Sequence, residues 1–85
     1  MASFLAHITV MPHDALLDPQ GKAVEKGLHH LGLDSLDQVR VGKHIRLQVQ
    51  ADSEEEANAL VTKACQELLH NKVMEHFHFH LEALK

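Results

Sequence analysis

Hydrophobic and polar residues alternate through the first part of this 85-residue chain. Over residues 3–11 one parity carries only apolar side chains, which are Phe4, Ala6, Ile8 and Val10. Successive side chains of a β-strand point to opposite faces of a sheet, so this alternation predicts a strand with one buried face. Pro12 to Asp14 supply the turn-forming residues that end it.

The next stretch, Leu17–Lys22, reads LDPQGK and predicts the start of a helix. Asp18 can accept hydrogen bonds from the unpaired N–H groups of a first turn, and Pro19 suits the first helical position because its φ is preset. Gly21 costs about 1 kcal/mol there relative to Ala, so helix stability does not explain it. We expect a close neighbour, from an oligomer or a partner subunit, to explain Gln20 and Gly21.

Helical spacing continues to about Leu31, with one apolar stripe made of Val24, Leu28 and Leu31. Gly32 follows directly, and a glycine there is typical of a helix end in the left-handed conformation. Leu33 can then fold back on the last turn. The first helix is therefore predicted to end at about Leu31.

Between Gln38 and Gln50 the apolar residues all fall on odd positions: Val39, Val41, Ile45, Leu47 and Val49. A two-residue loop within this stretch would mix the two faces, whereas the three-residue loop Gly42–His44 pairs Val41 with Ile45. Two alternatives fit the parity. One is a hairpin of that kind, which we favour, and the other is a single strand that bends at Gly42.

A second helix is predicted to begin at Ser53, because Ser53 and Glu56 have the spacing of a capping box. The carboxylates of Glu54–Glu56 also suit the positive end of the helix dipole. Asn71 is a plausible left-handed stop. Cys65, which lies in this helix, reads as a small buried hydrophobe. The apolar stripe consists of Ala57, Leu60, Val61, Ala64 and Leu68.

A last strand is predicted over Val73–Leu81, with phenylalanine and leucine on one face and histidine on the other. The order is β-α-β-β-α-β, which predicts an α+β two-layer sandwich in which an antiparallel sheet carries both helices on one face. Residues 1–85 form a single domain in this prediction. The other sheet face mixes Leu5, Met11 and Met74 with polar groups, which suits a subunit contact.

Composition narrows the classes of partner. A net charge of -4 without a dense Lys/Arg cluster disfavours nucleic acid, because phosphate binding depends on clustered cations. No apolar run approaches the roughly 20 residues of a membrane span, and the N-terminus lacks the pattern of a signal peptide. We therefore expect a cytoplasmic protein. A chain this short builds a thin core, so we also expect an oligomer, a dimer or a tetramer.

His76, His78 and His80 are the most conspicuous candidates for chemistry. Alternate strand residues point the same way roughly 6.5–7 Å apart, and neutral imidazole is the commonest metal ligand. A structural metal site needs further ligands and groups that orient each ring, and the sequence guarantees neither. We expect a solvated or interface face and no metal site. The alternative function is a stand-alone metal- or small-ligand-binding module that uses these three histidines.

Other signals of catalysis are missing from the sequence. It has no glycine-rich phosphate loop, no nucleophile motif and no pair of carboxylates in a setting that would shift their pKa values. The single cysteine excludes an internal disulfide and a cysteine-rich zinc site. We therefore predict no catalytic residue, no cofactor-binding residue and no metal ligand on this chain. The residues alone favour a binding or assembly protein.

Two blocks, LDPQGKAV at residues 17–24 and VRVGK at residues 39–43, together with Gly32 between them, give the chain a family likeness. It resembles PurS, the small subunits of phosphoribosylformylglycinamidine (FGAM) synthase. The likeness covers nearly the whole chain, because residues 65–69 and 71–75 also fit the second helix and last strand of that family. The loop Pro12–Leu17 and the histidine-rich final strand depart from the family pattern.

The resemblance implies a part in purine biosynthesis, in the ATP-dependent conversion of formylglycinamide ribonucleotide and glutamine into formylglycinamidine ribonucleotide. In that family a glutaminase subunit of PurQ type releases ammonia, and a synthetase subunit of PurL type uses ATP, with Mg²⁺, to add it to the substrate. A PurS dimer bridges the two and assists the transfer of ammonia. Residues in the two blocks that packing does not demand are candidates for partner contacts: Asp18, Gln20, Gly21, Lys22, Arg40 and Lys43.

Overall fold

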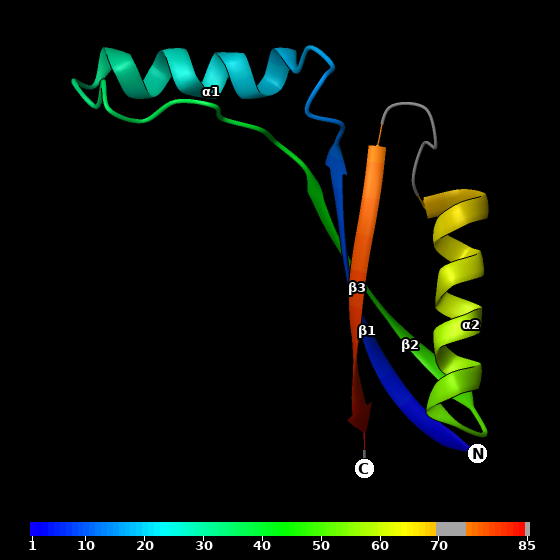
Figure 1. Cartoon of the computed structure of the whole chain (residues 1–85). Coiled ribbons are helices and arrows are strands. Elements are labelled where there is room, and N and C mark those ends of the chain that lie inside the picture. The colour runs from blue at the N-terminus through cyan, green and yellow to red at the C-terminus, as the bar shows by residue number, and fades with distance from the viewer. Residues whose placement is uncertain (70–74, 85) are drawn as a thin grey trace.

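Three antiparallel strands and two helices make up the structure, a computed structural model that describes residues 1–69 and 75–84. β1 lies in the middle of the sheet and pairs with β2 on one side and β3 on the other. The predicted α+β class and antiparallel sheet are confirmed. The elements, in chain order, are β1 (Ala2–Pro12), α1 (Pro19–His30), β2 (Lys43–Ala51), α2 (Glu54–Ala64), the π-helical turn η1 (Cys65–Leu69) and β3 (Glu75–Leu84) (Figure 1).

The predicted strand before Gly42 is wrong, and so is the hairpin that we favoured there. Residues 38–42 belong to no described strand, and β2 begins only at Lys43. The last β1 residue paired with β2 is Val10, opposite Lys43, whereas Met11 and Pro12 of β1 pair only with β3. Gly42 lies outside β2 and directly against the end of β1, so the single strand bent at Gly42 is not formed either. A Cβ on Gly42 would collide with the Met11 sulfur and the Val10 carbonyl oxygen, so this close approach requires glycine.

The strand faces are those that the parity predicts. β1 puts Phe4, Ala6, Ile8 and Val10 into the core, and β2 adds Val49 and Ala51. Cys65 is fully buried among them, as predicted for a small hydrophobe. On β3, Phe79 pairs opposite Ile8 on the core face, while His78 and His80 lie on the other face. Burial of one face fixes the register, because a slip of one residue would exchange the two faces.

α2 covers the core face of the sheet and packs on β1 and β2. Its predicted cap is confirmed, since the Glu56 N–H donates to Ser53 Oγ over 3.1 Å. The predicted stripe is only partly right, because Leu60 is 47% and Leu68 82% exposed. The wide π turn keeps Cys65 and Leu69 on the core side instead. The predicted stop Asn71, Met74 and the start of the predicted last strand lie outside the described residues.

The prediction that both helices lie on one face of the sheet is wrong. In Figure 1, α2 runs alongside the sheet, whereas α1 lies beyond one end of it and points away. β1 and β2 are antiparallel neighbours, so their link only has to reverse direction at that end. β2 and β3 run parallel to each other on either side of β1, so the chain must return along the sheet before β3 begins, and α2 makes this crossover. We call residues 13–42, which include α1, the arm.

α1 ends as predicted. Gly32 has a φ of 86°, and its N–H donates to the His29 carbonyl oxygen over 3.0 Å. The Leu33 N–H donates to the Leu28 carbonyl oxygen over 3.0 Å. This pair of bonds is a Schellman motif, which returns the chain along the helix. The return segment is held further along by the His29 ring, whose Nε2 lies 2.7 Å from the Leu36 carbonyl oxygen.

Candidate functional site

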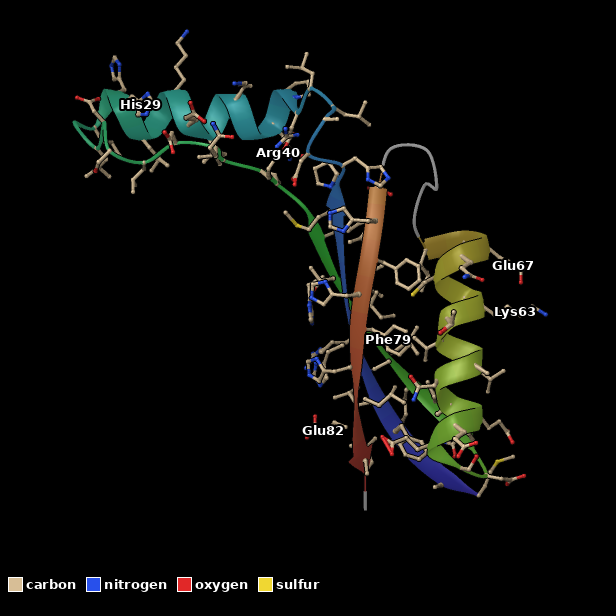
Figure 2. All side chains as sticks on the ribbon, viewed as in Figure 1. His29, Arg40, Lys63, Glu67, Phe79 and Glu82 are labelled. Carbon is tan, nitrogen blue, oxygen red and sulfur yellow. The ribbon has the colours of Figure 1, made fainter. Side chains whose placement is uncertain are left out.

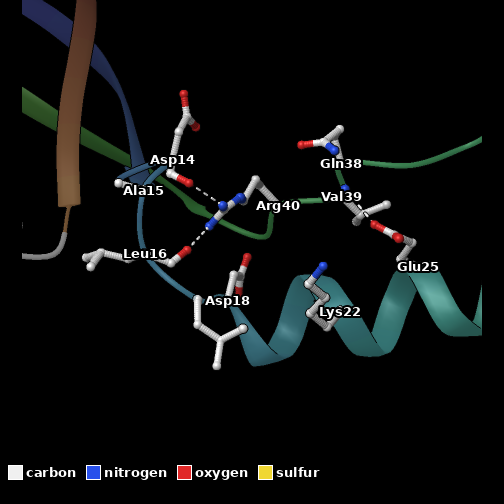
Figure 3. A pocket seen from close by; sticks show the side chains of 10 residues that line it. Asp14, Ala15, Leu16, Asp18, Lys22, Glu25, Gln38, Val39 and Arg40 are labelled. Atoms are coloured by element: carbon white, nitrogen blue, oxygen red, sulfur yellow. Dashed lines mark hydrogen bonds between the residues drawn. The ribbon is translucent and has the colours of Figure 1, made fainter.

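Arg40 fastens the arm where it leaves the sheet. Its guanidinium donates to the main-chain carbonyl oxygens of Leu16 and Asp14, each over 2.5 Å, and more weakly to that of His13 over 3.5 Å. Figure 3 shows the guanidinium inserted between the loop that precedes α1 and the segment that returns from it. A planar group with five donors can hold several carbonyl oxygens at once. Arg40 thereby links the outgoing and returning halves of the arm.

Asp18 occupies the N-cap position of α1, but its side chain makes no cap hydrogen bond, which corrects our prediction. Its Oδ2 instead accepts a hydrogen bond from the Val41 N–H over 2.8 Å. This bond is the largest cause of the lowered pKa of the Asp18 carboxyl group, and the nearby Gly21 N–H, which does not meet the geometry of a cap hydrogen bond, lowers it further. Partial desolvation opposes the shift, and the positive charge of Arg40 adds a smaller lowering. Asp18 therefore forms a second link, beside that of Arg40, between the start of α1 and the return segment.

Gly21 is the buried residue of α1, and the return segment passes directly over it. A Cβ at this position would collide with the Val39 carbonyl oxygen and lie 2.7 Å from Asp18 Oδ2. The close neighbour that we expected from an oligomer or a partner therefore lies in the same chain. One helical turn further on, Glu25 Oε1 accepts from the Val39 N–H over 3.2 Å. We call the residues Asp18, Gly21, Glu25 and Arg40, together with the main chain of 39–41, the clasp.

Sequence reasoning did not single out Glu25. The signal that could have found it is its spacing, because Gly21 and Glu25 are four residues apart and share one helix face. A helix face that holds a glycine and a carboxylate one turn apart can bind an extended main chain: the glycine lets it approach and the carboxylate accepts its N–H.

The six candidate residues divide into two groups. Asp18, Gly21 and Arg40 are used within the clasp. Gln20, Lys22 and Lys43 are exposed, and Lys43 Nζ lies 4.0 Å from Glu75 Oε2 at the start of β3. A hollow of about 330 Å³ opens beside the clasp and is lined by Lys22, Glu25 and Gln38 among others (Figure 3). The three exposed candidates are therefore available to a partner, and the three that belong to the clasp shape the surface that carries them.

The open face of the sheet, on the side away from α2, carries the histidines. The His7 ring stacks on that of His80 with centroids 4.6 Å apart, and His7 Nε2 lies 3.0 Å from Glu82 Oε1. Figure 2 shows Glu82 on this side and Phe79 on the side of α2. Among residues 1–69 and 75–84, no group of three or more side chains is placed to hold a metal ion. The described residues therefore give the metal-binding alternative no support.

The clasp and the arm are typical of a structural subunit rather than of a catalytic one. Every contact of the clasp is structural, and it fixes a helix that projects from a small antiparallel sheet, which suits a subunit that holds others together. The model of the family PurS: Phosphoribosylformylglycinamidine (FGAM) synthase matches residues 5–83. The chain therefore belongs to the PurS family. No helix within the described residues combines the length and apolar character needed to cross a bilayer.

Three relatives illustrate the family likeness. The chain is 40% identical over 83 residues to the FGAM synthase subunit PurS of Synechocystis, which covers 98% of this chain and 83% of that protein. A structure of PurLQS from Thermotoga maritima is similar with a TM-score of 0.85 and 34% identity, covering 99% of this chain and 100% of that one. PurS from Thermus thermophilus has a TM-score of 0.83 and 36% identity, with 98% and 99% covered.

Proposed function

We propose that this chain is a non-catalytic assembly subunit of FGAM synthase in purine biosynthesis. It bridges a synthetase subunit of PurL type and a glutaminase subunit of PurQ type, and it forms a homo-oligomer to do so. The observation that carries the proposal is the likeness to a chain of the Thermotoga maritima PurLQS structure over the full length of both chains. In this role residues 1–85 act as one domain in the cytoplasm.

The chemistry of the complex then belongs to its other subunits. ATP and Mg²⁺ act in the synthetase, ammonia arises in the glutaminase, and this chain binds no cofactor. Ammonia that escaped into water would be protonated and would lose its nucleophilic lone pair, so the two sites must be joined without exposure to solvent. A rigid, shape-complementary subunit between them serves that purpose. The clasp supplies the rigidity of the arm.

The exposed candidates Gln20, Lys22 and Lys43 make the partner contacts in this proposal. Asp18, Gly21 and Arg40 act as positioning residues, since they hold the arm that carries Gln20 and Lys22. The division rests on exposure. A side chain that is already bonded to its own main chain has little capacity for another protein, whereas an exposed lysine or glutamine retains its donors.

Reconstitution from purified subunits tests the proposal. Glutamine-dependent formation of the amidine should fall sharply when this chain is left out, while the reaction supplied with a high concentration of ammonium salt should persist in the synthetase alone. A Gln20→Ala, Lys22→Ala double variant should weaken co-elution with the synthetase, and Lys26→Ala on the same helix is the matched control. Glutamine-dependent activity that is unchanged without this chain would refute the assembly role.

A further inference from the structure

The hollow beside the clasp is lined by the loop 14–17, the first turns of α1 and residues 38–40. Its volume of about 330 Å³ is near the lower end of the roughly 300–1,000 Å³ of ligand pockets in proteins, so it suits a small molecule. Figure 3 shows Asp18, Lys22 and Glu25 along α1. Arg40 and Gln38 lie across from them on the return segment. Charged groups of both signs therefore face one small space.

The charged groups on the helix side of the hollow do not pair with one another. Lys22 follows Asp18 by four residues and precedes Glu25 by three, and opposite charges at these spacings usually attract. In the described part of the chain, Lys22 nevertheless forms no ion pair with either carboxylate. Asp18 Oδ2 and Glu25 Oε1 accept instead from the main-chain N–H groups of Val41 and Val39. The second oxygen of each carboxylate and the Lys22 ammonium therefore remain available to a ligand.

The return segment adds a cation and an amide. At most three of the five N–H donors of Arg40 serve the carbonyl oxygens of the loop, and its positive charge remains. Gln38 has a φ of 56°, a left-handed conformation that is uncommon for residues other than glycine. Strained residues of this kind gather at ligand sites, and the side-chain amide of Gln38 can both donate and accept. The hollow therefore offers two cations, two carboxylates and one amide.

The balance of these charges selects the kind of ligand. The two cations offset the two carboxylates, and Figure 3 shows the carboxylate of Asp14, which also lines the hollow, pointing away from it. A simple ion of either sign would be attracted by one pair of groups and repelled by the other. A zwitterion carries an ammonium and a carboxylate a few bonds apart, so it complements both pairs at once.

We propose that the hollow beside the clasp binds a free α-amino acid with a polar side chain. Its α-carboxylate accepts from Lys22 and Arg40. Its α-ammonium donates to Asp18 and Glu25, and its side chain reaches Gln38. These groups stand on both α1 and the return segment, so the bound amino acid stabilises the clasp. The site goes beyond the proposed assembly role and does not depend on it, although both use Lys22.

Titration of the full chain with L-glutamine tests the site, with the backbone amide signals of residues 38–41 as the readout. A ligand of about ten non-hydrogen atoms should bind with a dissociation constant of about 1 mM. Glutaramate is glutamine without its α-amino group, and 4-aminobutyramide is glutamine without its α-carboxylate. Each should bind at least about tenfold more weakly, because it leaves one pair of charges unmatched. Equal affinity for all three compounds, or no saturable shift up to about 50 mM glutamine, would overturn the proposal.

Two variants each remove one charge from the hollow. Lys22→Gln removes the ammonium, and Glu25→Gln removes a negative charge while keeping an oxygen that accepts from the Val39 N–H. Each should raise the dissociation constant for glutamine at least about tenfold. Lys26→Gln, on the same helix but outside the hollow, is the matched control and should change it less than about threefold. Circular dichroism checks that all three variants fold.

The outcome separates this site from the assembly role. An unchanged dissociation constant in Lys22→Gln and Glu25→Gln would overturn the amino-acid site, whatever reconstitution with the other subunits shows. A chain that binds glutamine as expected, yet can be left out of the complex without loss of glutamine-dependent activity, would refute the assembly role alone.

Discussion

Replacing Gly21 by alanine is the sharpest test of the clasp. A methyl group there would collide with the Val39 carbonyl oxygen and lie 2.7 Å from Asp18 Oδ2 and 3.0 Å from the Val39 carbonyl carbon. Two of these three atoms are main chain, so they cannot move aside as a flexible side chain would. Relief requires the return segment to lift off the helix, which would break the hydrogen bond from the Val39 N–H to Glu25.

The expected magnitude follows from opposing contributions. Alanine gains about 1 kcal/mol over glycine in a helix. Overpacking of this kind costs about 1–3 kcal/mol, and the lost hydrogen bond costs about another 1 kcal/mol. The gain from alanine and the loss of the hydrogen bond cancel, so the free energy of unfolding should fall by about 2 kcal/mol, the middle of the overpacking range. For a domain of this size the melting temperature should drop by about 8–16 °C.

Gly27→Ala is the matched control, because a Cβ on Gly27 meets nothing within 4 Å. It should raise the free energy of unfolding by about 1 kcal/mol. Thermal unfolding by circular dichroism in dilute solution measures both variants, and amide exchange shows whether protection is lost in residues 39–41. The two alanine substitutions thus change the free energy of unfolding in opposite directions within one helix. A Gly21→Ala protein as stable as Gly27→Ala would show that the return segment does not lie on Gly21.

Three further substitutions and one labelling experiment test other parts of the structure. Arg40→Ala should lower the free energy of unfolding by about 2 kcal/mol. Arg40→Lys should be nearly as damaging, because an ammonium group does not reproduce the guanidinium fork. A stable Arg40→Ala protein with slow amide exchange in the loop 13–17 would contradict this. Asp18 has a lowered pKa in the folded state, so its contribution to the free energy of unfolding is present above about pH 4 and is lost as pH falls through the folded value. Asp18→Asn should therefore flatten the acid side of a plot of unfolding free energy against pH. An unchanged slope would argue against the bond to Val41. Ser53→Ala should cost about 1 kcal/mol in chemical denaturation, with Ser53→Asp as the control that restores the cap. Cys65 is fully buried, so a thiol reagent at pH 8 should label it only when the protein opens, and burial also raises the pKa of its thiol, which slows the reaction further. Rapid labelling in native buffer would place Cys65 at the surface.

The strand faces and helix ends of this protein are local properties, and the sequence predicts them well. The parity of residues 3–11 places Ile8 in the core because alternation depends only on strand geometry. Ser53 and Gly32 act at their helix ends through atoms a few residues away. Such features need no knowledge of the rest of the fold.

The failures concern partners that are distant in the sequence. The stripe of α1 looks the same whether a sheet in the same chain or in a second chain covers it, so the pattern could not show that α1 leaves its own sheet. The parity of Val39 and Val41 predicted a strand, but a strand also needs a pairing partner, and these residues are bonded to the α1 side instead. The Val39 N–H donates to Glu25, and the Val41 N–H donates to Asp18. Asp18 was assigned to its local N–H groups, and Val41, 23 residues further along, took that place.

The clasp holds the loop 13–17 through main-chain atoms. Arg40 binds the carbonyl oxygens of Asp14 and Leu16, and those atoms are the same whatever side chains the loop carries. The exposed side chains of Asp14, Ala15 and Leu17 can therefore be exchanged without loosening the arm. That freedom makes the loop a position for a fluorescent label, from which assembly of the complex could be followed in real time without touching either helix.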